Sequence, residues 1–256
     1  MTRLVVAGLQ LDIVWGDKNA NFERVRCFAA EAKERGVELL VLPEMFATGF
    51  LLEPAVTAEG EGGETTAFLR DLAREHGMAV VGGLVRARRN GRGANVAIAV
   101  ANDGRVLAEY SKTHLISLYG EGAAHEAGAG PRPFAFAGAE MACFICYDLR
   151  FPELFRLVAA GTSIVLVIAS WPSLRQRHWD LLLPARAVEN LQFVVGVNRV
   201  GSGGGHAFLG GTAIYDPLGN ALAQGGDAEG LVVAELDLDL VAKARAGLPA
   251  LGDRRF

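Results

Sequence analysis

The sequence predicts an α/β fold, because strand-like apolar runs alternate with helix-like runs along its 256 residues. A chain of this length can bury a sizeable core as one large domain. No linker and no short-period repeat divides it. We therefore expect a single domain over residues 1–256.

The first half of the chain predicts strands and helices in alternation. Residues 21–35 have helical periodicity, with Phe22, Val25 and Ala29 on one face, and residues 65–76 predict a second helix. Two further strands, 95–100 and 105–110, are expected to form a hairpin across Asn102-Asp103-Gly104. The strands expected before this hairpin are 4–11, 37–42 and 78–84.

The second half continues the pattern after a loop rich in Gly, Ala and Pro at 120–133. Residues 152–160 and 177–190 predict helices, and Pro184 should kink or restart the second one. The β-branched strand 163–169 is expected to be buried on both faces. Residues 201–205 are expected to form a flexible loop. The other expected strands are 140–146, 193–198, 211–215, 221–224 and 231–236.

Charge and cysteine content exclude several classes of protein. Lys plus Arg total 25 against 29 for Asp plus Glu, without a long basic run, so we expect no nucleic-acid partner. Three cysteines are too few for a disulfide scaffold and fit a reducing cytoplasm. Gln10 and Asp12 interrupt the apolar start, which is too short and polar for a signal or membrane segment. We expect a soluble cytoplasmic protein that does not bind membranes.

Three strand-like segments each end in one ionisable side chain: Glu44, Lys112 and Cys146. Since α/β sheets form their ligand clefts at strand ends, the three side chains can converge. A carboxylate can accept the thiol proton, and an ammonium can stabilise a thiolate or a developing oxyanion. Pro152 can open a helix after Cys146, and we expect the N-H groups of that helix start to favour a thiolate.

Each of these residues also has an ordinary structural explanation. Glu44 alone is more often a solvated loop acid or helix cap, and Lys112 alone is more often a surface charge. Cys146 alone is equally consistent with a buried structural thiol. Their joint pattern favours a cysteine nucleophile with a base and an oxyanion donor.

Three motifs follow one another along the chain: Leu42-Pro-Glu44-Met-Phe46, Tyr110-Ser-Lys112-Thr-His-Leu115 and Cys146-Tyr-Asp-Leu-Arg150-Phe-Pro-Glu153. In these motifs, their order and their spacing, the chain resembles the nitrilase superfamily of carbon-nitrogen hydrolases. Further similar stretches are Ala169-Ser-Trp-Pro172, Ala185-Arg-Ala-Val-Glu-Asn190 and Asn198-Arg-Val-Gly201, so the likeness covers nearly the whole chain. The resemblance implies a four-layer α-β-β-α sandwich and an amidase that acts through a thioester, without a metal or organic cofactor.

The resemblance also implies roles for the three residues: Cys146 is the nucleophile, Glu44 the general base and Lys112 the oxyanion stabiliser. Many members use a second glutamate, seven residues before a glycine in the loop after the lysine. Glu121 has this spacing to Gly128. The loop lacks the proline that many members place before that glycine, so Glu126 stays an alternative, as does a solvated role for either acid.

Two segments, Pro43-Glu-Met-Phe-Ala-Thr-Gly-Phe50 and Ser170-Trp171-Pro172, look most like the omega-amidase branch, whose members hydrolyse monoamides of short 2-oxo dicarboxylic acids. The carboxylate of such a substrate needs a cationic or N-H-rich partner. Arg150, Arg175 and Arg177 are candidates, although each can equally be a structural ion-pair partner.

The expected pocket is completed by Tyr147, whose backbone N-H is placed at the oxyanion, and by Phe50 and Trp171 as walls. Aromatic residues are more often part of a core. The alternatives are a hydrolase of N-carbamoyl amines or amino acids, or a non-catalytic binding protein on the same fold.

Two other cysteine chemistries are less consistent with the sequence. Cys143 and Cys146 form a C-x-x-C, but an offset of three along a strand points the side chains to opposite faces, and a second cysteine pair for a zinc site is missing. We expect Cys143 to be a core residue and no metal to be bound. A papain-like pair with a histidine is conceivable, but the resemblance gives no histidine that role.

The resemblance also bears on assembly. The family commonly dimerises, and residues 248–256 resemble a tail that crosses to a partner. We therefore expect a homodimer or higher homo-oligomer.

Overall fold

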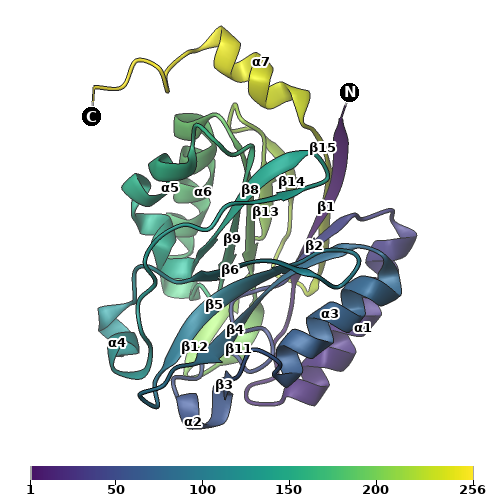
Figure 1. The fold of residues 1–256 in the computed structure, drawn as a ribbon, viewed down its shortest axis with the longest axis vertical. Coiled ribbons are helices and arrows are strands. Elements are labelled where there is room, and N and C mark those ends of the chain that lie inside the picture. The colour runs from purple at the N-terminus through teal and green to yellow at the C-terminus, as the bar shows by residue number, and fades with distance from the viewer. Residues whose placement is uncertain (1, 256) are drawn as a thin grey trace.

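The protein was analysed as a computed structural model that describes residues 2–255. Two β-sheets pack face to face at its centre (Figure 1). The first contains β1 (Arg3–Gln10), β2 (Leu39–Val41), β3 (Ala58–Glu59), β4 (Ala79–Ala87), β5 (Gly93–Val100), β6 (Val106–Ser111) and β15 (Gly230–Asp237). Its order is β15-β1-β2-β4-β5-β6, and β3 pairs with β4.

The second sheet has six strands in the order β14-β13-β10-β9-β8-β7. They are β7 (Phe134–Phe136), β8 (Ala139–Ile145), β9 (Ile164–Ala169), β10 (Phe193–Asn198), β13 (Ala213–Tyr215) and β14 (Ala221–Gln224). A separate hairpin consists of β11 (Val200–Gly203) and β12 (His206–Leu209).

Helices cover the outer faces of both sheets. α1 (Lys18–Glu34) and α3 (Glu64–His76) lie on the first sheet, and α5 (Pro152–Val158) and α6 (Gln176–Asn190) on the second (Figure 1). The predicted four-layer α-β-β-α arrangement is therefore confirmed. The remaining helices are α2 (Pro54–Thr57), α4 (Glu121–Ala124) and α7 (Asp239–Gly247), with 3-10 turns at Ser117–Tyr119, Cys146–Arg150 and Ser173–Arg175. Within residues 2–255, no helix is both long and apolar enough to span a membrane.

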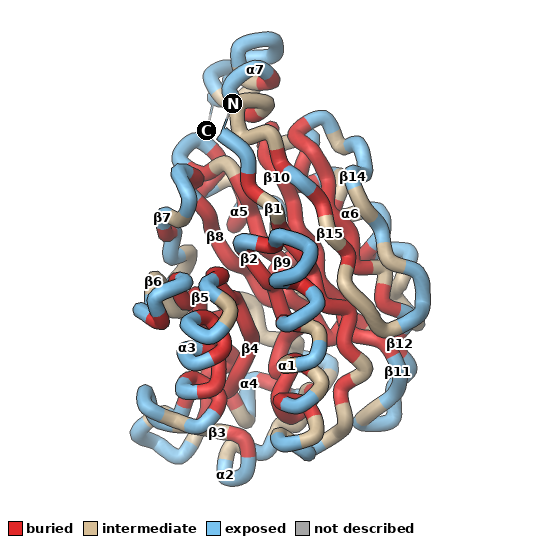
Figure 2. Tube along the Cα trace, turned by 90° about the vertical axis from the view of Figure 1, so that its right-hand side faces the viewer, coloured by how far each residue is buried: buried red, intermediate tan, exposed pale blue. Residues whose placement is uncertain are grey.

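The central strands of the two sheets are buried on both faces, because side chains on either face of such a strand pack into a core. In β1, Leu4 and Val6 belong to the core between the sheets, whereas Ala7 and Leu9 belong to the core under α1 and α3. This assignment follows the alternation of side chains along a strand. Figure 2 shows the resulting continuous buried interior, with exposed residues on the helices and loops.

The structure corrects several local predictions. Residues 201–205 are not a flexible loop, because they lie in and between the paired strands β11 and β12. α6 continues through Pro184 and does not restart there. Asp180, whose carbonyl loses its helical partner at Pro184, is exposed, so water can reach it. The elements α2, α4, α7, β3 and β7 were not predicted, since most span four residues or fewer.

Candidate active site

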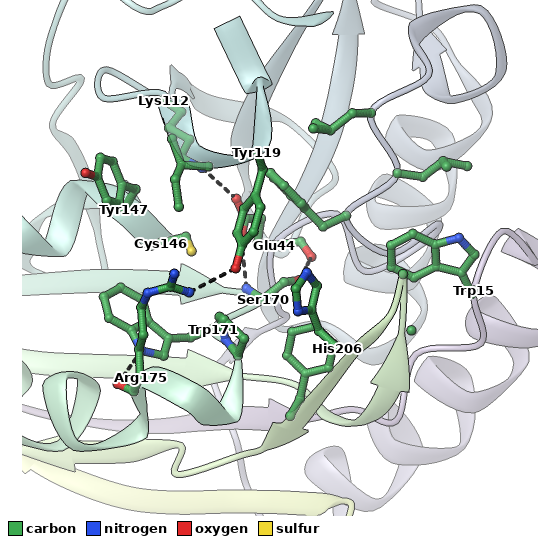
Figure 3. A pocket seen from close by; sticks show the side chains of 18 of the residues that line it. Trp15, Glu44, Lys112, Tyr119, Cys146, Tyr147, Ser170, Trp171, Arg175 and His206 are labelled. Atoms are coloured by element: carbon green, nitrogen blue, oxygen red, sulfur yellow. Dashed lines mark hydrogen bonds and ion pairs between the residues drawn. The ribbon is translucent and has the colours of Figure 1, made fainter.

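The structure brings Glu44, Lys112 and Cys146 together at the ends of strands from both sheets (Figure 3). Glu44 follows β2, Lys112 follows β6 and Cys146 follows β8. The Lys112 Nζ lies 3.1 Å from Glu44 Oε1, and both side chains are fully buried. All three residues line one cavity of about 260 Å³.

A strained turn presents the thiol of Cys146. The backbone of Cys146 has φ +47°, a left-handed conformation that costs free energy for a residue with a Cβ. The buried carboxylate of Asp148 fixes the turn, because it accepts hydrogen bonds from Ile145 N at 3.1 Å and Tyr110 OH at 2.7 Å. It also accepts one from His114 N at 2.8 Å. The thiol therefore points into the cavity from a rigid support.

Hydrogen bonds at both oxygens hold the carboxylate of Glu44. Oε1 accepts from Asn95 Nδ2 at 2.7 Å, and Oε2 accepts from the backbone N-H of Ser170 at 2.8 Å. Gly83 permits the close approach of this strand end, since a Cβ there would lie 2.5 Å from Met45 N. Glu44 is thus placed by three segments far apart in sequence.

Glu121, rather than Glu126, joins this cluster. Glu121 is fully buried, with Oε2 2.9 Å from Lys112 Nζ, and it accepts a hydrogen bond from Ile116 N at 2.8 Å. Glu126 is partly exposed and accepts a hydrogen bond from Asn90 Nδ2 at 2.6 Å. The structure therefore supports Glu121 of the two alternatives. We call Glu44, Lys112 and Glu121 the buried charge cluster.

The buried charge cluster fixes the protonation of its members. Burial alone would lower the pKa of Lys112, but the charges of Glu44 and Glu121 outweigh burial and raise it above its ordinary value. Burial alone would raise the pKa of Glu121, but the Lys112 ammonium outweighs it and lowers that pKa to about 2. Lys112 is therefore a permanent cation held by a permanent anion at neutral pH.

The same surroundings keep Cys146 protonated before substrate binds. Burial and the Glu44 carboxylate raise the pKa of the thiol well above its ordinary value, and the Lys112 charge offsets only part of this rise. The expectation that a helix start would favour a resting thiolate is therefore wrong. The thiol must therefore lose its proton to a base before it can act as a nucleophile, and the Glu44 carboxylate lines the same cavity.

The predicted substrate-binding residues all reach the cavity. Phe50, Tyr147, Arg150 and Trp171 line it, and so does Arg175. Arg177 is exposed and does not contribute to the lining, so this candidate for a carboxylate partner is not supported.

The two arginines of the cavity are free of carboxylate partners within residues 2–255. The Arg150 guanidinium lies 4.7 Å from the centre of the Trp171 ring, and its Nη1 is 3.1 Å from His178 Nδ1. Arg175 Nη1 donates to Tyr119 OH at 2.9 Å. Burial, and to a smaller extent the charge of Arg175, lower the pKa of Arg150. Two neighbouring uncompensated cations favour an anionic ligand.

The sequence did not predict the other residues that line the cavity. Trp15, Tyr119, Leu51, Leu52, Ile116, Pro172, Gly203, Gly204, His206 and Phe208 also line it. Trp15 packs against the β11–β12 hairpin so closely that a Cβ on Gly203 or Gly204 would lie 2.5 Å from its ring. The glycines at 203 and 204 are the sequence signal for this part of the cavity, because only residues without a Cβ leave room for the Trp15 ring.

The described residues do not favour redox or metal chemistry at the C-x-x-C. Cys143 is buried in the core between the sheets, where burial raises its pKa to about 12, and both cysteines are free thiols. Over residues 2–255, no group of three or more His, Cys, Asp or Glu side chains is arranged to hold a metal ion.

Fold and site together define a hydrolase with a cysteine nucleophile. Residues 5–246 match the family model for carbon-nitrogen hydrolases. The 2-oxoglutaramate amidase of Bacillus subtilis is 36% identical over 252 residues, which cover 98% of this chain and 97% of that protein. An omega-amidase of Yersinia enterocolitica is 35% identical over 99% of this chain and 97% of its own length. The chain belongs to the carbon-nitrogen hydrolase family.

Solved structures agree with this membership. A CN-hydrolase superfamily protein of Xanthomonas campestris, with an arsenic adduct in its active site, has a TM-score of 0.93 and 30% identity, covering 100% of this chain and 98% of that one. A mutant amidase from Nesterenkonia sp., with the acetamide moiety of fluoroacetamide added at its active-site cysteine, has a TM-score of 0.87 and 31% identity over 98% and 94% of the two chains. The prediction of a cysteine-dependent amidase of the omega-amidase branch is confirmed.

Proposed function

We propose that this carbon-nitrogen hydrolase releases ammonia from monoamides of short 2-oxo dicarboxylic acids, such as 2-oxoglutaramate. The observation that carries the proposal is that Arg150 and Arg175, two guanidiniums without a carboxylate partner among residues 2–255, line the same cavity as Cys146. A substrate with an amide at one end and a carboxylate at the other matches this arrangement. The name of the Bacillus subtilis relative supports the same substrate class.

In the first half-reaction, Glu44 takes the proton of Cys146 as the sulfur attacks the amide carbonyl. The oxyanion of the tetrahedral intermediate accepts hydrogen bonds from Lys112 Nζ and the backbone N-H of Tyr147. Glu44 then protonates the departing nitrogen, the carbon-nitrogen bond breaks, and ammonia leaves a thioester on Cys146.

In the second half-reaction, Glu44 takes a proton from water, which attacks the thioester carbonyl. Lys112 and Tyr147 again hold the oxyanion. The carbon-sulfur bond breaks, Glu44 returns the proton to the sulfur, and the dicarboxylic acid leaves. Glu121 keeps Lys112 charged throughout, since the two side chains are 2.9 Å apart.

Assembly and location stay predictions. A homodimer or higher homo-oligomer in the cytoplasm fits a family that commonly dimerises. The proposed crossing tail includes Phe256, which lies outside the described residues. Sedimentation would measure the oligomeric state.

Ammonia release tests the proposed substrate class. The wild-type enzyme should hydrolyse 2-oxoglutaramate much faster than 4-oxopentanamide, which has a methyl group in place of the carboxylate. Cys146→Ala should abolish release while the circular dichroism spectrum stays unchanged. Arg175→Met should raise KM for 2-oxoglutaramate about tenfold or more, because a charge-assisted hydrogen bond is lost, and leave KM for the neutral amide unchanged.

Two outcomes would contradict the proposal. Equal turnover of the charged and neutral amides would remove the role of the arginines. Faster release of ammonia from N-carbamoyl amino acids than from 2-oxoglutaramate would favour the alternative substrate class.

A further inference from the structure

His125 is a buried histidine beside the buried charge cluster, and the mechanism above does not use it. It directly follows α4, and its ring has no exposed surface. Its Nδ1 lies 3.6 Å from Glu121 Oε1, and neither ring nitrogen has a hydrogen-bond partner among residues 2–255. Burying an imidazole without partners costs free energy, so its position needs an explanation.

The backbone around His125 fixes the ring next to the carboxylate. The His125 N-H donates to Glu121 O at 2.8 Å, and the Glu126 N-H donates to Gly93 O at 2.8 Å. Arg92 donates to the carbonyl of His125. Gly93 leaves space for the ring, because a Cβ there would lie 3.0 Å from His125 Cδ2. The ring therefore has little freedom to move away from Glu121.

The donors that now satisfy Glu121 Oε1 are shared with Glu44. Oε1 of Glu121 accepts hydrogen bonds from Lys112 Nζ and Asn95 Nδ2, each at 3.1 Å. The same atoms donate to Glu44 Oε1, at 3.1 Å from Lys112 and 2.7 Å from Asn95. When Lys112 turns an N-H toward the oxyanion, Glu121 loses part of its hydrogen bonding. A buried carboxylate that loses a donor is destabilised.

We propose that His125 is a positioning residue, whose neutral imidazole donates Nδ1-H to Glu121 Oε1 when Lys112 turns toward the oxyanion. The separation of 3.6 Å is slightly longer than a hydrogen bond. Hydrogen bonds that matter for catalysis are often long in a free enzyme and shorten in the substrate complex. His125 thereby replaces the hydrogen bond from Lys112 that Glu121 loses. This role rests on the proposed function, because it needs an oxyanion at Lys112.

Three substitutions at position 125 test the proposal through ammonia release from 2-oxoglutaramate. His125→Leu keeps the volume but removes the donor, and we expect kcat to fall about tenfold while KM stays within about twofold. His125→Asn places an amide N-H near the position of Nδ1 and should recover most of kcat. His125→Gln carries its amide toward the position of Nε2 and should recover less.

A purely structural role predicts the opposite order, because a leucine can be buried without hydrogen-bond partners at lower cost than an asparagine amide. A wild-type kcat in His125→Leu, or a kcat in His125→Leu above that in His125→Asn, would overturn the proposal. If His125→Leu does not fold, the comparison of kcat between His125→Asn and His125→Gln decides. Equal kcat values in these two variants would overturn the proposal.

The same assay separates this proposal from the proposed function. Wild-type enzyme that hydrolyses another amide but not 2-oxoglutaramate contradicts the substrate class alone, and the three variants are then compared on that amide. Wild-type enzyme that releases no ammonia from any amide overturns both proposals.

Discussion

Replacing Glu121 by glutamine removes one charge from the buried charge cluster and keeps the shape of the side chain. The Lys112 ammonium outweighs burial and lowers the pKa of Glu121 from an ordinary 4.5 to about 2. A shift of this size corresponds to about 3 kcal/mol of folding free energy at pH 7. We expect Glu121→Gln to lower the free energy of unfolding by about this amount, because Lys112 loses a buried partner.

The pH dependence of this loss follows from the direction of the shift. The pKa of Glu121 is lower in the folded than in the unfolded protein, so its contribution is complete above the unfolded-state pKa and is lost as the pH falls through the folded-state pKa. The difference between wild type and Glu121→Gln should therefore shrink from about 3 kcal/mol at pH 7 to about 2 kcal/mol at pH 3.5. Urea unfolding at both pH values measures it.

Glu126→Gln is the matched control, five residues along the same loop. Its carboxylate is partly exposed and lies 4.0 Å from Arg88, so its removal should change the free energy of unfolding by less than about 0.5 kcal/mol. Ammonia release should fall in Glu121→Gln and persist in Glu126→Gln. If both variants are as stable and as active as wild type, the reasoning about the cluster is refuted.

Two further predictions concern the turn at Cys146. Burial and the Glu44 carboxylate keep the Cys146 thiol protonated, so its pKa should lie above the ordinary value of 9.0. A pH titration of the thiolate absorbance at 240 nm, with Cys146→Ser as the control that lacks this signal, measures the pKa. A midpoint below 9.0 would contradict the argument. Asp148→Asn should lower the free energy of unfolding in urea by about 2 kcal/mol and should lower kcat, because the charge that accepts hydrogen bonds from Tyr110 and His114 is lost. An unchanged kcat would show that the position of the thiol does not depend on Asp148.

The positions of Glu44, Lys112 and Cys146 could be predicted because each ends a strand, and strand ends are visible as changes from apolar to polar residues. Their convergence, however, depends on how the two sheets pack against each other, and the periodicity of residues along the chain does not predict that packing. The resemblance to a known family supplied that step. The resemblance also supplied Glu121, because its spacing to Gly128 matches the family's pattern.

The residues that support the site could not be predicted in the same way. Asn95 lies within β5 and Ser170 follows β9, so neither has a local pattern that indicates a bond to Glu44, 51 and 126 residues away in sequence. Gly128 donates its N-H to Lys112 O at 2.8 Å, and a Cβ there would clash with Ser111 O. Only the folded chain shows this contact.

Before substrate enters, the enzyme keeps Cys146 in the form that oxidants attack slowly. Peroxides oxidise thiolates, and the products beyond the sulfenic acid are largely irreversible. Burial and the Glu44 carboxylate raise the pKa of Cys146, so less of this thiol is present as the thiolate that peroxides attack, whereas Cys27 is exposed on the surface. We therefore expect peroxide to inactivate the free enzyme more slowly than it would inactivate an enzyme with a resting thiolate.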